Sequence, residues 1–451
     1  MGSSLLSIGG IILANRHTLQ ELQEMQALPL NLKIRLTQQR IREWINHFGL
    51  DGVYVSFSGG KDSTVLMDIA REMYPNIKAM FVDVPTQYPE LREFVKTYEN
   101  VDVVRPKINF VDVCEKYGFP LISKEVSECV QGARKYLTSI LNEQASLTDR
   151  QTDRQTDRQT DRQTDLPYRY FFDKVTGTGK YTKKANTPSV DRQSILKASS
   201  GGGTTGSIAG LEELANFLEY RRRNHKGGQN QRLAIMLGML TNDQTIRANI
   251  PSQDKSQFSL EKYKFFMECP FEISNKCCNV MKKDPAHRYY KETGRVPITA
   301  QMASESRLRT QKWLQNSCNG FELKIPTSNP MSFWTEQDVL LYIKTRNLPI
   351  CSVYGDVVSD DEEMGQIDFM QYTGLEIFDR GNQPLHCTGC QRTGCVCCGF
   401  GAHLNGDTRF VDLKKTHPQM YKLLDIATNN GYTMRQAIDW VNEYGNLNIK
   451  Y

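Results

Sequence analysis

The sequence predicts an α/β fold with a doubly wound, mainly parallel sheet, a low-complexity and helical insertion and a Cys-rich C-terminal region. Strand and helix patterns alternate from residue 32 to residue 117, which is typical of parallel sheets. A glycine-rich turn joins the first strand to the next helix, and regular patterning stops near residue 140 and resumes near residue 260. With 451 residues, the chain is long enough for two or three structural units.

The first elements follow one another in a regular order. Apolar residues at helical spacing predict a helix at residues 32–48, and Gly52 separates it from a strand at 53–57. The elements that follow are a helix at 63–73, a strand at 79–84, a helix at 89–98, a strand at 101–104 and a helix at 110–117. Because a helix separates each strand from the next, the strands are expected to run parallel.

The patterns divide the chain into five regions. They are an N-terminal segment (1–31), the first part of the α/β domain (32–146), an insertion (147–256), the second part of the domain (257–346) and the Cys-rich region (347–451). In the second part, Thr335 is followed three residues later by Asp338. This spacing is that of a capping box, with Asp in place of Glu, and predicts the start of a helix.

The insertion contains a perfect four-residue repeat, TDRQTDRQTDRQTDRQTD, at residues 148–165. The repeat has no apolar residue and cannot bury a core, so it is expected to be a solvated linker or a marginal helix. By the genetic code, the tetranucleotide CAGA repeated in one frame encodes Gln-Thr-Asp-Arg. Gain or loss of one unit would shift the reading frame and switch expression; the alternative is an expansion tolerated in a loop.

The first predicted strand ends in SGGKDS, which has the composition of an anion-binding turn. Gly59 and Gly60 permit positive φ and a close approach of the backbone to a ligand. The unpaired N–H groups and the dipole of the following helix favour an anion at the same place. Ser58 and Ser63 add hydroxyl donors and Lys61 adds a charge, so a phosphate or pyrophosphate is expected. The spacing matches neither a Walker A loop nor GxGxxG; the alternative is a capped turn that binds nothing.

SGGKDS resembles the PP-loop of the adenine-nucleotide α-hydrolase superfamily, whose fold is Rossmann-like. FVDVPTQYPE, residues 81–90, resembles the corresponding segment of the phosphoadenosine phosphosulfate (PAPS) reductase family. That resemblance implies that Asp83 lies beside the sugar or base of an adenine nucleotide, at the carboxyl edge of the sheet. Asp83 could equally cap the end of its strand.

A pair of arginines in MASESRLR, Arg307 and Arg309, suits bidentate contact with sulfate, phosphate or nucleic acid. The PAPS reductase family has an Arg-rich region in this role, although this sequence lacks the usual glycine-arginine opening. A helical face with salt bridges is the alternative. Lys61, Asp62 and Arg307 are the predicted catalytic residues. The predicted nucleotide-binding residues are Ser58, Gly59, Gly60, Lys61, Asp62, Ser63, Asp83, Arg307 and Arg309.

Cysteines cluster in two places, which favours metal binding over a disulfide framework. Cys277 and Cys278 are adjacent, and Cys395 and Cys398 form a later Cys-x-x-Cys pair. Together they resemble the [4Fe–4S] ligand set of the iron–sulfur adenylyl-sulfate reductases, in which four thiolates close one cluster. The additional cysteines Cys387 and Cys390 leave the ligand set open, because with Cys395 and Cys398 they could form a zinc site instead.

Classical reductases of this family end in a tail with a nucleophilic cysteine, whereas this sequence has no cysteine after Cys398. The overall resemblance is therefore to a subgroup near the DNA phosphorothioation sulfurtransferases. It implies an enzyme that binds ATP and Mg²⁺, cleaves the α–β bond and activates an acceptor for sulfur transfer. A sulfonucleotide reductase that uses PAPS or adenylyl sulfate, with Cys387 or Cys390 as its thiol, is the alternative. A non-catalytic nucleotide-sensing module of a defence complex is the third hypothesis.

Composition bounds the partners of the protein. The net charge of +5 permits nucleic-acid contact without arguing for it. A nucleic-acid acceptor and a sulfur-donor protein are expected as partners because of the resemblance alone. No apolar run is long enough to span a bilayer, and the segment LLSIGGIILA near the N-terminus lacks the features of a signal peptide. A cytoplasmic protein without a membrane partner is expected.

Overall fold

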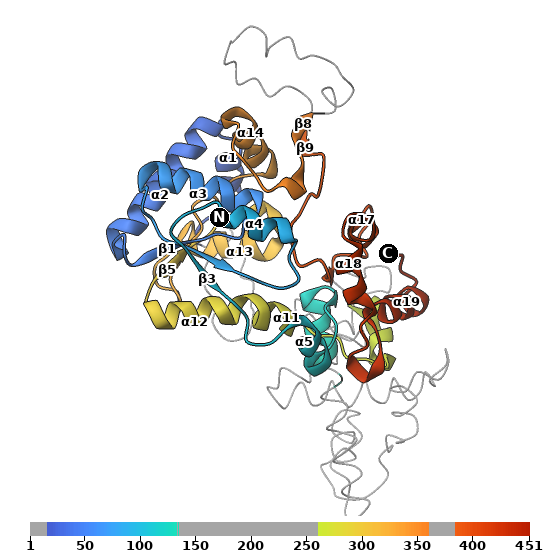
Figure 1. The fold of residues 1–451 in the computed structure, drawn as a ribbon. Helices are drawn as coiled ribbons and strands as arrows, with labels where there is room; N and C mark the ends of the chain where they lie inside the picture. Colours follow the sequence, from blue (N-terminus) through green and yellow to red (C-terminus); the bar gives the residue numbers. More distant parts are fainter. Residues whose placement is uncertain (1–15, 133, 135–259, 360–383) are drawn as a thin grey trace, which may run out of the picture. The chain divides into compact units, whose positions relative to one another are not determined.

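The computed structural model describes residues 16–132, 134, 260–359 and 384–451 (Figure 1). The predicted insertion, with the QTDR repeat and its helical stretches, lies outside the described residues. The chain divides into two compact units. Unit 1 comprises the described residues of Gly9–Phe110 and Cys278–Val396, and unit 2 those of Val111–Cys277 and Cys397–Tyr451. The boundaries of the five regions predicted above stay predictions.

Unit 1 is built on a sheet of six strands in the order β3-β2-β1-β5-β7-β6. All neighbouring strands are parallel except β6 and β7, which are antiparallel. The predicted mainly parallel α/β fold is therefore confirmed. The strands are β1 (Val53–Ser56), β2 (Ala79–Val82), β3 (Val101–Val104), β5 (Val296–Ile298), β6 (Asn319–Gly320) and β7 (Thr327–Ser328).

Helices cover both faces of this sheet, and Figure 1 draws α2 and α3 on one side of it and α12 on the other. Side chains alternate along a strand, so Val55 of β1 packs into the main core whereas Tyr54 faces the opposite side. Tyr54 meets Tyr289 of α12, with the ring centroids 5.0 Å apart. The helices of unit 1 are α1 (Leu19–Gln26), α2 (Leu30–Phe48), α3 (Lys61–Met73), α4 (Pro89–Lys96), α12 (Asp284–Thr293), α13 (Arg307–Asn316) and α14 (Glu336–Arg346).

The elements agree with the predicted ones to within two residues at each end, which is the usual uncertainty of such boundaries. The predicted capping box is also present. The Thr335 side chain accepts a hydrogen bond from the backbone N–H of Asp338, and the Asp338 carboxylate accepts one from the backbone N–H of Thr335. The short pieces of unit 1 include the 3₁₀ turn η6 (Ser352–Tyr354) and the antiparallel pair β8 (Val357–Ser359) and β9 (Leu385–Cys387).

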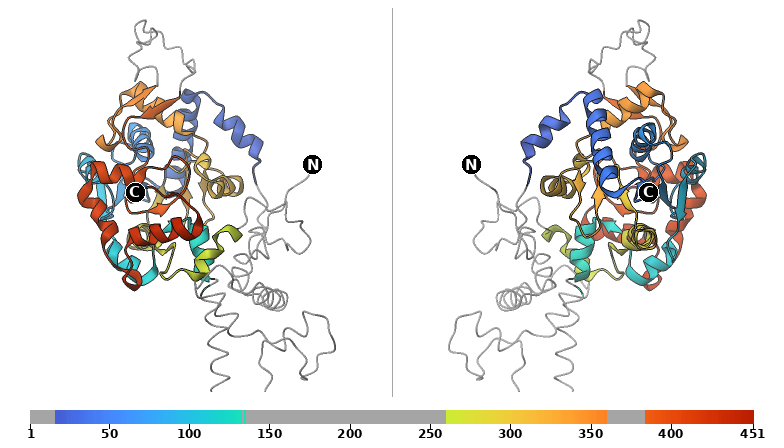
Figure 2. Two further views of the ribbon diagram at one scale, coloured as in Figure 1. Left: turned by 90° about the vertical axis from the view of Figure 1, so that its right-hand side faces the viewer. Right: turned by 90° about the vertical axis from the view of Figure 1, so that its left-hand side faces the viewer.

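Unit 2 has its own core, in which the aromatic rings of Phe271 and Trp440 pack edge to face at 5.5 Å. Asn429 is buried there, and its amide bonds the backbone of Glu272 and Cys114. Its elements include α5 (Phe110–Tyr117), β4 (Leu121–Ile122), η3 (Glu261–Glu268), β10 (Gly399–Phe400), α17 (Arg409–Thr416), α18 (Pro418–Tyr421) and α19 (Met434–Gly445), and Figure 2 gives two further views of the fold. None of the helices described in either unit is long and apolar enough to cross a bilayer.

Candidate nucleotide-phosphate site

In the turn between β1 and α3, Gly59 uses the positive φ that its sequence permits, whereas Gly60 is extended with φ -76°. Gly59 has φ +73°, a backbone conformation that favours glycine. A Cβ added there would also lie 3.1–3.2 Å from side-chain carbons of Val95 and Leu91, so the space around the residue favours glycine as well. Serine hydroxyls hold the turn. Ser58 N donates to Ser63 Oγ at 3.1 Å, and Gly60 N donates to Ser58 Oγ at 3.3 Å. The turn therefore places backbone amides, hydroxyls and the start of a helix at one point.

Lys61 is the first residue of α3, and its side chain is nearly buried, with the whole residue 4% exposed. Its ammonium lies 3.1 Å from Glu336 Oε1 and 3.5 Å from Asp62 Oδ1, and it donates to the carbonyl oxygen of Gln391 at 3.4 Å. Burial lowers the pKa of Lys61, but the two carboxylates outweigh burial and the pKa is raised overall. The site therefore holds a permanent cation at the helix start.

Two hydroxyl groups from distant parts of the chain lie against the same turn. The backbone N–H of Lys61 donates to Tyr354 Oη at 3.1 Å, and Tyr354 Oη lies 2.6 Å from Thr393 Oγ1. The Tyr354 ring also lies 5.7 Å from the Lys61 ammonium, within the range of a cation–π contact. Burial raises the pKa of Tyr354 to about 12, so the phenol stays protonated at neutral pH.

Asp62 faces the same cation. Its Oδ1 is shielded from solvent and accepts no hydrogen bond from the described residues. Burial raises the pKa of Asp62, and Lys61 opposes that rise. The carboxylate oxygens of Asp62 and Glu336 are hard ligands of the kind that Mg²⁺ prefers. These two residues therefore suit a Mg²⁺ ion, in addition to the phosphate that Lys61 suits.

Asp83 follows β2 at the carboxyl edge of the sheet and is 8% exposed. Both of its oxygens are engaged by arginines. Arg92 Nε donates to Oδ1 at 2.5 Å, and Arg105 Nε donates to Oδ2 at 2.9 Å. The charge of the Asp83 carboxylate is thus balanced by two guanidinium groups. Arg92 also donates to the carbonyl oxygen of Val84 at 3.2 Å. Whether Asp83 contacts a nucleotide stays a prediction.

The predicted arginine pair begins α13. Arg307 is the first residue of this helix, and its side chain lies outside what the structure describes. Arg309 forms an ion pair with Glu305, as the alternative of a helical salt-bridge face predicts. Burial lowers the pKa of Arg309, and Asp62 opposes that effect through its charge. The Arg309 guanidinium is therefore within electrostatic range of the phosphate loop.

The predicted metal ligands are distributed over both units. Cys278 and Cys395 belong to unit 1, and Cys277 and Cys398 belong to unit 2. Within the described ranges, no group of three or more His, Cys, Asp or Glu residues is placed to hold a metal ion. The alternates Cys387 and Cys390 lie in unit 1. Burial raises the pKa of the Cys387 thiol and Lys61 opposes that rise, so this thiol is within electrostatic range of the loop.

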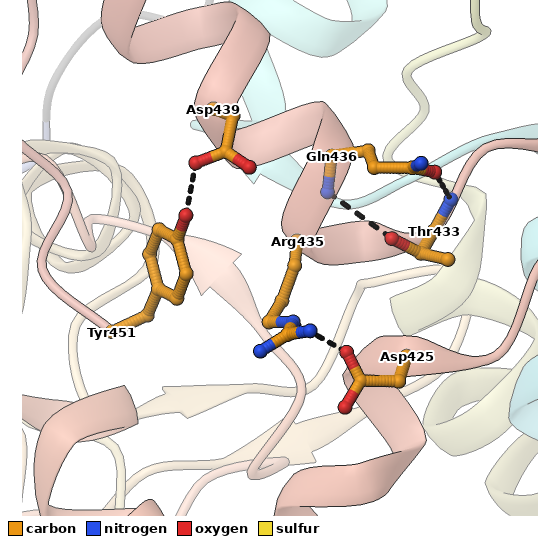
Figure 3. Close-up of a pocket in the computed structure, with 6 residues that line it drawn as sticks. All are labelled: Asp425, Thr433, Arg435, Gln436, Asp439 and Tyr451. Atoms are coloured by element: carbon orange, nitrogen blue, oxygen red, sulfur yellow. Dashed lines mark hydrogen bonds and ion pairs between the residues drawn. The ribbon is translucent and has the colours of Figure 1, made fainter.

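Unit 2 contains a separate pocket of about 380 Å³, shown in Figure 3. Most of the polar groups that line it have partners within the lining, either side chains or backbone N–H groups. Arg435 Nε meets Asp425, Tyr451 Oη meets Asp439, and Gln436 N donates to Thr433 Oγ1 at 3.1 Å. The groups of the phosphate loop are paired within the protein as well, so the loop of unit 1 is the better candidate site because of its glycine turn and its motif.

The fold and the loop together define a PP-loop protein of the adenine-nucleotide α-hydrolase superfamily, as predicted. The chain belongs to the phosphoadenosine phosphosulfate reductase family. The family profile described as the phosphoadenosine phosphosulfate reductase domain matches residues 52–138 and 229–399, more than half of the chain. Family membership is therefore confirmed, whereas the proposed closeness to the DNA phosphorothioation sulfurtransferases stays a prediction.

Several solved structures are similar to this chain. One of them is phosphoadenylyl-sulfate (PAPS) reductase from Candida auris in a phosphate complex, with 11% sequence identity and a TM-score of 0.27 over 74% of this chain and 90% of that chain. No curated protein matches the sequence.

Sequence reasoning missed several residues at the loop: Glu336, Tyr354, Gln391 and Thr393. One of them had a usable signal. Glu336 directly follows Thr335, the predicted helix cap, and acidic side chains are favoured in the first turn of a helix. Tyr354, Gln391 and Thr393 had none, because only the tertiary fold brings residues about 300 positions away to the loop.

Proposed function

We propose that this protein is a nucleotide-cleaving enzyme that binds ATP at the phosphate loop and breaks the α–β phosphoanhydride bond. The observation that carries the proposal is the nearly buried Lys61 ammonium at the start of α3, beside the amides and hydroxyls of the loop. A buried cation next to helix N–H groups suits two linked phosphates better than a single weak anion. Cleavage would activate an acceptor as its adenylate, ready for sulfur transfer.

Each residue of the loop has a role in this proposal. Lys61 and the Ser63 hydroxyl would stabilise the negative charge that develops on the leaving pyrophosphate. Arg309 would hold the anionic acceptor or the α-phosphate, since its guanidinium is within electrostatic range of Asp62. Asp62 and Glu336 would hold Mg²⁺, which when bound supplies further charge neutralisation on the phosphates.

The second candidate is a sulfonucleotide reductase, and the position of two thiols favours it. Cys387 is within electrostatic range of Lys61, and Cys390 Sγ lies 3.9 Å from Tyr88 Oη in the same unit. One thiolate would form an S–S bond to the sulfonyl sulfur as the nucleotide leaves. The other would then displace sulfite and leave a disulfide, which an external dithiol must reduce. The raised pKa of Cys387 disfavours its thiolate, so this candidate ranks second.

One set of assays separates the candidates. The protein is purified without oxygen and incubated with ATP, adenylyl sulfate or PAPS in the presence of Mg²⁺. Pyrophosphate release that depends on Lys61 supports the first candidate, and sulfite release supports the second. Tight nucleotide binding without either product would contradict both and leave the nucleotide-sensing module of a larger complex.

The iron–sulfur cluster is proposed on the resemblance and tested by itself. Thiolate-bound iron gives a broad absorption near roughly 400 nm. Protein prepared without oxygen is analysed for iron, sulfide and zinc, and compared with a Cys395→Ser, Cys398→Ser variant. Iron and sulfide lost in the variant support the cluster; zinc without iron supports the four-thiolate alternative that includes Cys387 and Cys390.

A further inference from the structure

Donor groups of the phosphate loop already give their hydrogen bonds to oxygen atoms of the protein itself. The N–H of Lys61 is the first amide of α3 and donates to Tyr354 Oη at 3.1 Å. A Cβ added to Gly60 would lie 3.2 Å from both Tyr354 Oη and Thr393 Oγ1, so the two hydroxyls lie directly against the loop. An oxygen of Tyr354 therefore stands where an oxygen of a bound phosphate would stand.

The residues that carry these hydroxyls form one connected piece. Gly389 N donates to the carbonyl oxygen of Tyr354, and Cys390 N donates to that of Val353, both at 2.8 Å. The 3₁₀ turn η6 is thereby joined to the segment that contains Thr393. We call η6 together with residues 389–393 the latch. Because backbone hydrogen bonds join its two parts, displacement of Tyr354 is expected to move both of them.

The latch also engages the charge of the loop. The Lys61 ammonium donates to Gln391 O of the latch at 3.4 Å, and its remaining near partners are the carboxylates of Glu336 and Asp62. A phosphate that approaches this cation must replace these contacts. The carboxylates of Asp62 and Glu336 raise the pKa of Lys61 against the effect of burial, so the cation beside the latch stays charged.

We propose that Tyr354 holds the phosphate loop closed and that the phosphates of the nucleotide displace its hydroxyl from the Lys61 amide. This inference rests on the proposed function, because it assumes that the loop binds phosphates. A single N–H donates well to one acceptor, so a phosphate oxygen and Tyr354 Oη compete for it. Tyr354 is a positioning residue here, not a catalytic one: it acts on the ligand by occupying a donor.

The test measures the binding of inorganic pyrophosphate and of ATP by calorimetry, in the wild type and in Tyr354→Phe. The variant keeps the ring and loses only the competing oxygen. It is expected to bind pyrophosphate about two- to tenfold more tightly, the ratio that corresponds to one net hydrogen bond. Thr393→Val, which removes only the partner of that hydroxyl, is expected to give a smaller gain. Tyr342→Phe is the matched control, because Tyr342 is also buried but bonds Asp68; its affinity should be unchanged.

Amide hydrogen exchange at Lys61 supplies a second readout that a purely structural tyrosine would not move. Without ligand, the Lys61 amide should exchange faster in Tyr354→Phe than in the wild type, and pyrophosphate should restore its protection in both. Weaker pyrophosphate binding in Tyr354→Phe would overturn the latch, since the hydroxyl would then contact the anion. Equal binding would overturn it as well.

The outcomes for the latch and for the proposed function are distinct. Tighter binding of pyrophosphate and ATP by Tyr354→Phe, with no cleavage of ATP by either protein, would support the latch and contradict the proposed activity. Absence of binding in both the wild type and Tyr354→Phe would overturn both.

Discussion

In the described part of unit 1, two nearly buried lysines each pair with a carboxylate of helix α14. The two pairs differ in how exposed that carboxylate is. Lys33 of α2 is 0% exposed and donates to Asp338 Oδ2 at 2.5 Å; Lys61 of α3 is 4% exposed and lies 3.1 Å from Glu336 Oε1. Asp338 and Glu336 both belong to the first turn of α14.

The partner carboxylates explain why one lysine is structural and the other is available to a ligand. Asp338 also accepts hydrogen bonds from the N–H and the hydroxyl of Thr335, each at 2.7 Å, so it is fixed within the helix cap. The side chain of Glu336 is 47% exposed. A buried charge whose partner is fixed stabilises the fold. A buried charge whose partner borders solvent can exchange that partner for a phosphate. Burial of a lysine alone therefore does not distinguish the two roles.

The largest expected effect is on stability at Lys33. Lys33→Met would leave Asp338 without its ammonium partner and destabilise the protein by about 3–5 kcal/mol, as is typical when one member of a buried ion pair is removed. The free energy of unfolding is measured by denaturant titration. A combined Lys33→Met, Asp338→Leu variant should recover part of this loss, apart from about 1 kcal/mol for the missing cap. If Lys33→Met lowered the free energy of unfolding by less than about 1 kcal/mol, the Lys33–Asp338 ion pair would not have the stabilising role given to it here.

The next effect is on activity at Lys61. Lys61→Gln removes the cation that faces the developing charge and should slow pyrophosphate release by about 100- to 1,000-fold, the usual consequence of losing one such group. The rate is measured with saturating ATP, and a thermal melt checks the fold. Lys78→Gln, which removes an exposed lysine paired with Asp102, is the control and should keep full activity. Undiminished release by Lys61→Gln would refute the role given to this residue.

A smaller effect is expected at the exchangeable partner. Glu336→Gln removes a negative charge that competes with phosphate for Lys61, so the affinity for pyrophosphate measured without Mg²⁺ should rise a few-fold, in line with about 0.5–1 kcal/mol for a half-exposed ion pair. With Mg²⁺ the gain should shrink, because the same carboxylate is then missing as a ligand. Stability should fall by less than about 1 kcal/mol, the value of an acidic residue in the first turn of a helix. A gain that is equal with and without Mg²⁺ would exclude Glu336 as a metal ligand.

The smallest effect is on pH dependence. The pKa of Lys61 is raised above its usual 10.5, so the stability contributed by its ion pairs is complete below pH 10.5 and is lost only as the pH rises through the higher folded value. Between about pH 7 and about pH 9, neither the stability nor the pyrophosphate affinity should change through this group. Pyrophosphate titrates by itself in this range, so the affinity is expressed relative to Lys61→Gln at each pH. A ratio that falls as the pH rises through about 8 would contradict the raised pKa.

The sequence was sufficient for the parts of the site that are local. SGGKDS contains its own reasons for the turn: the glycine with positive φ, the serines that hold the amides and the lysine that opens the helix. Thr335 and Asp338 likewise identified the start of α14 from their spacing. Short segments of this kind also carried the family resemblance, which the family profile over residues 52–138 and 229–399 confirms.

The parts that could not be predicted depend on long-range contacts. Tyr354 and Thr393 reach the loop because η6 and residues 389–393 fold back onto it, and no local pattern encodes that path. The contact between Arg105 and Asp83 could not be predicted for the same reason, because Arg105 lies 22 residues away in the sequence, beyond the next strand. The sequence placed Asp83 at the sheet edge but did not indicate that both of its oxygens would be engaged.

The antiparallel pair β6 and β7 at one end of the sheet has a consequence for the edges of the described sheet. An exposed sheet edge offers unpaired N–H and C=O groups to any other strand, and proteins avoid self-association by making such edges short or charged. At one edge β6 has only two residues, Asn319 and Gly320, which is too few to template another strand. At the other edge β3 carries Asp102, which is paired with Lys78 and Tyr289. The described sheet of unit 1 thus ends in a two-residue strand at one edge and in a strand with a paired carboxylate at the other, two features that limit pairing with a further strand there.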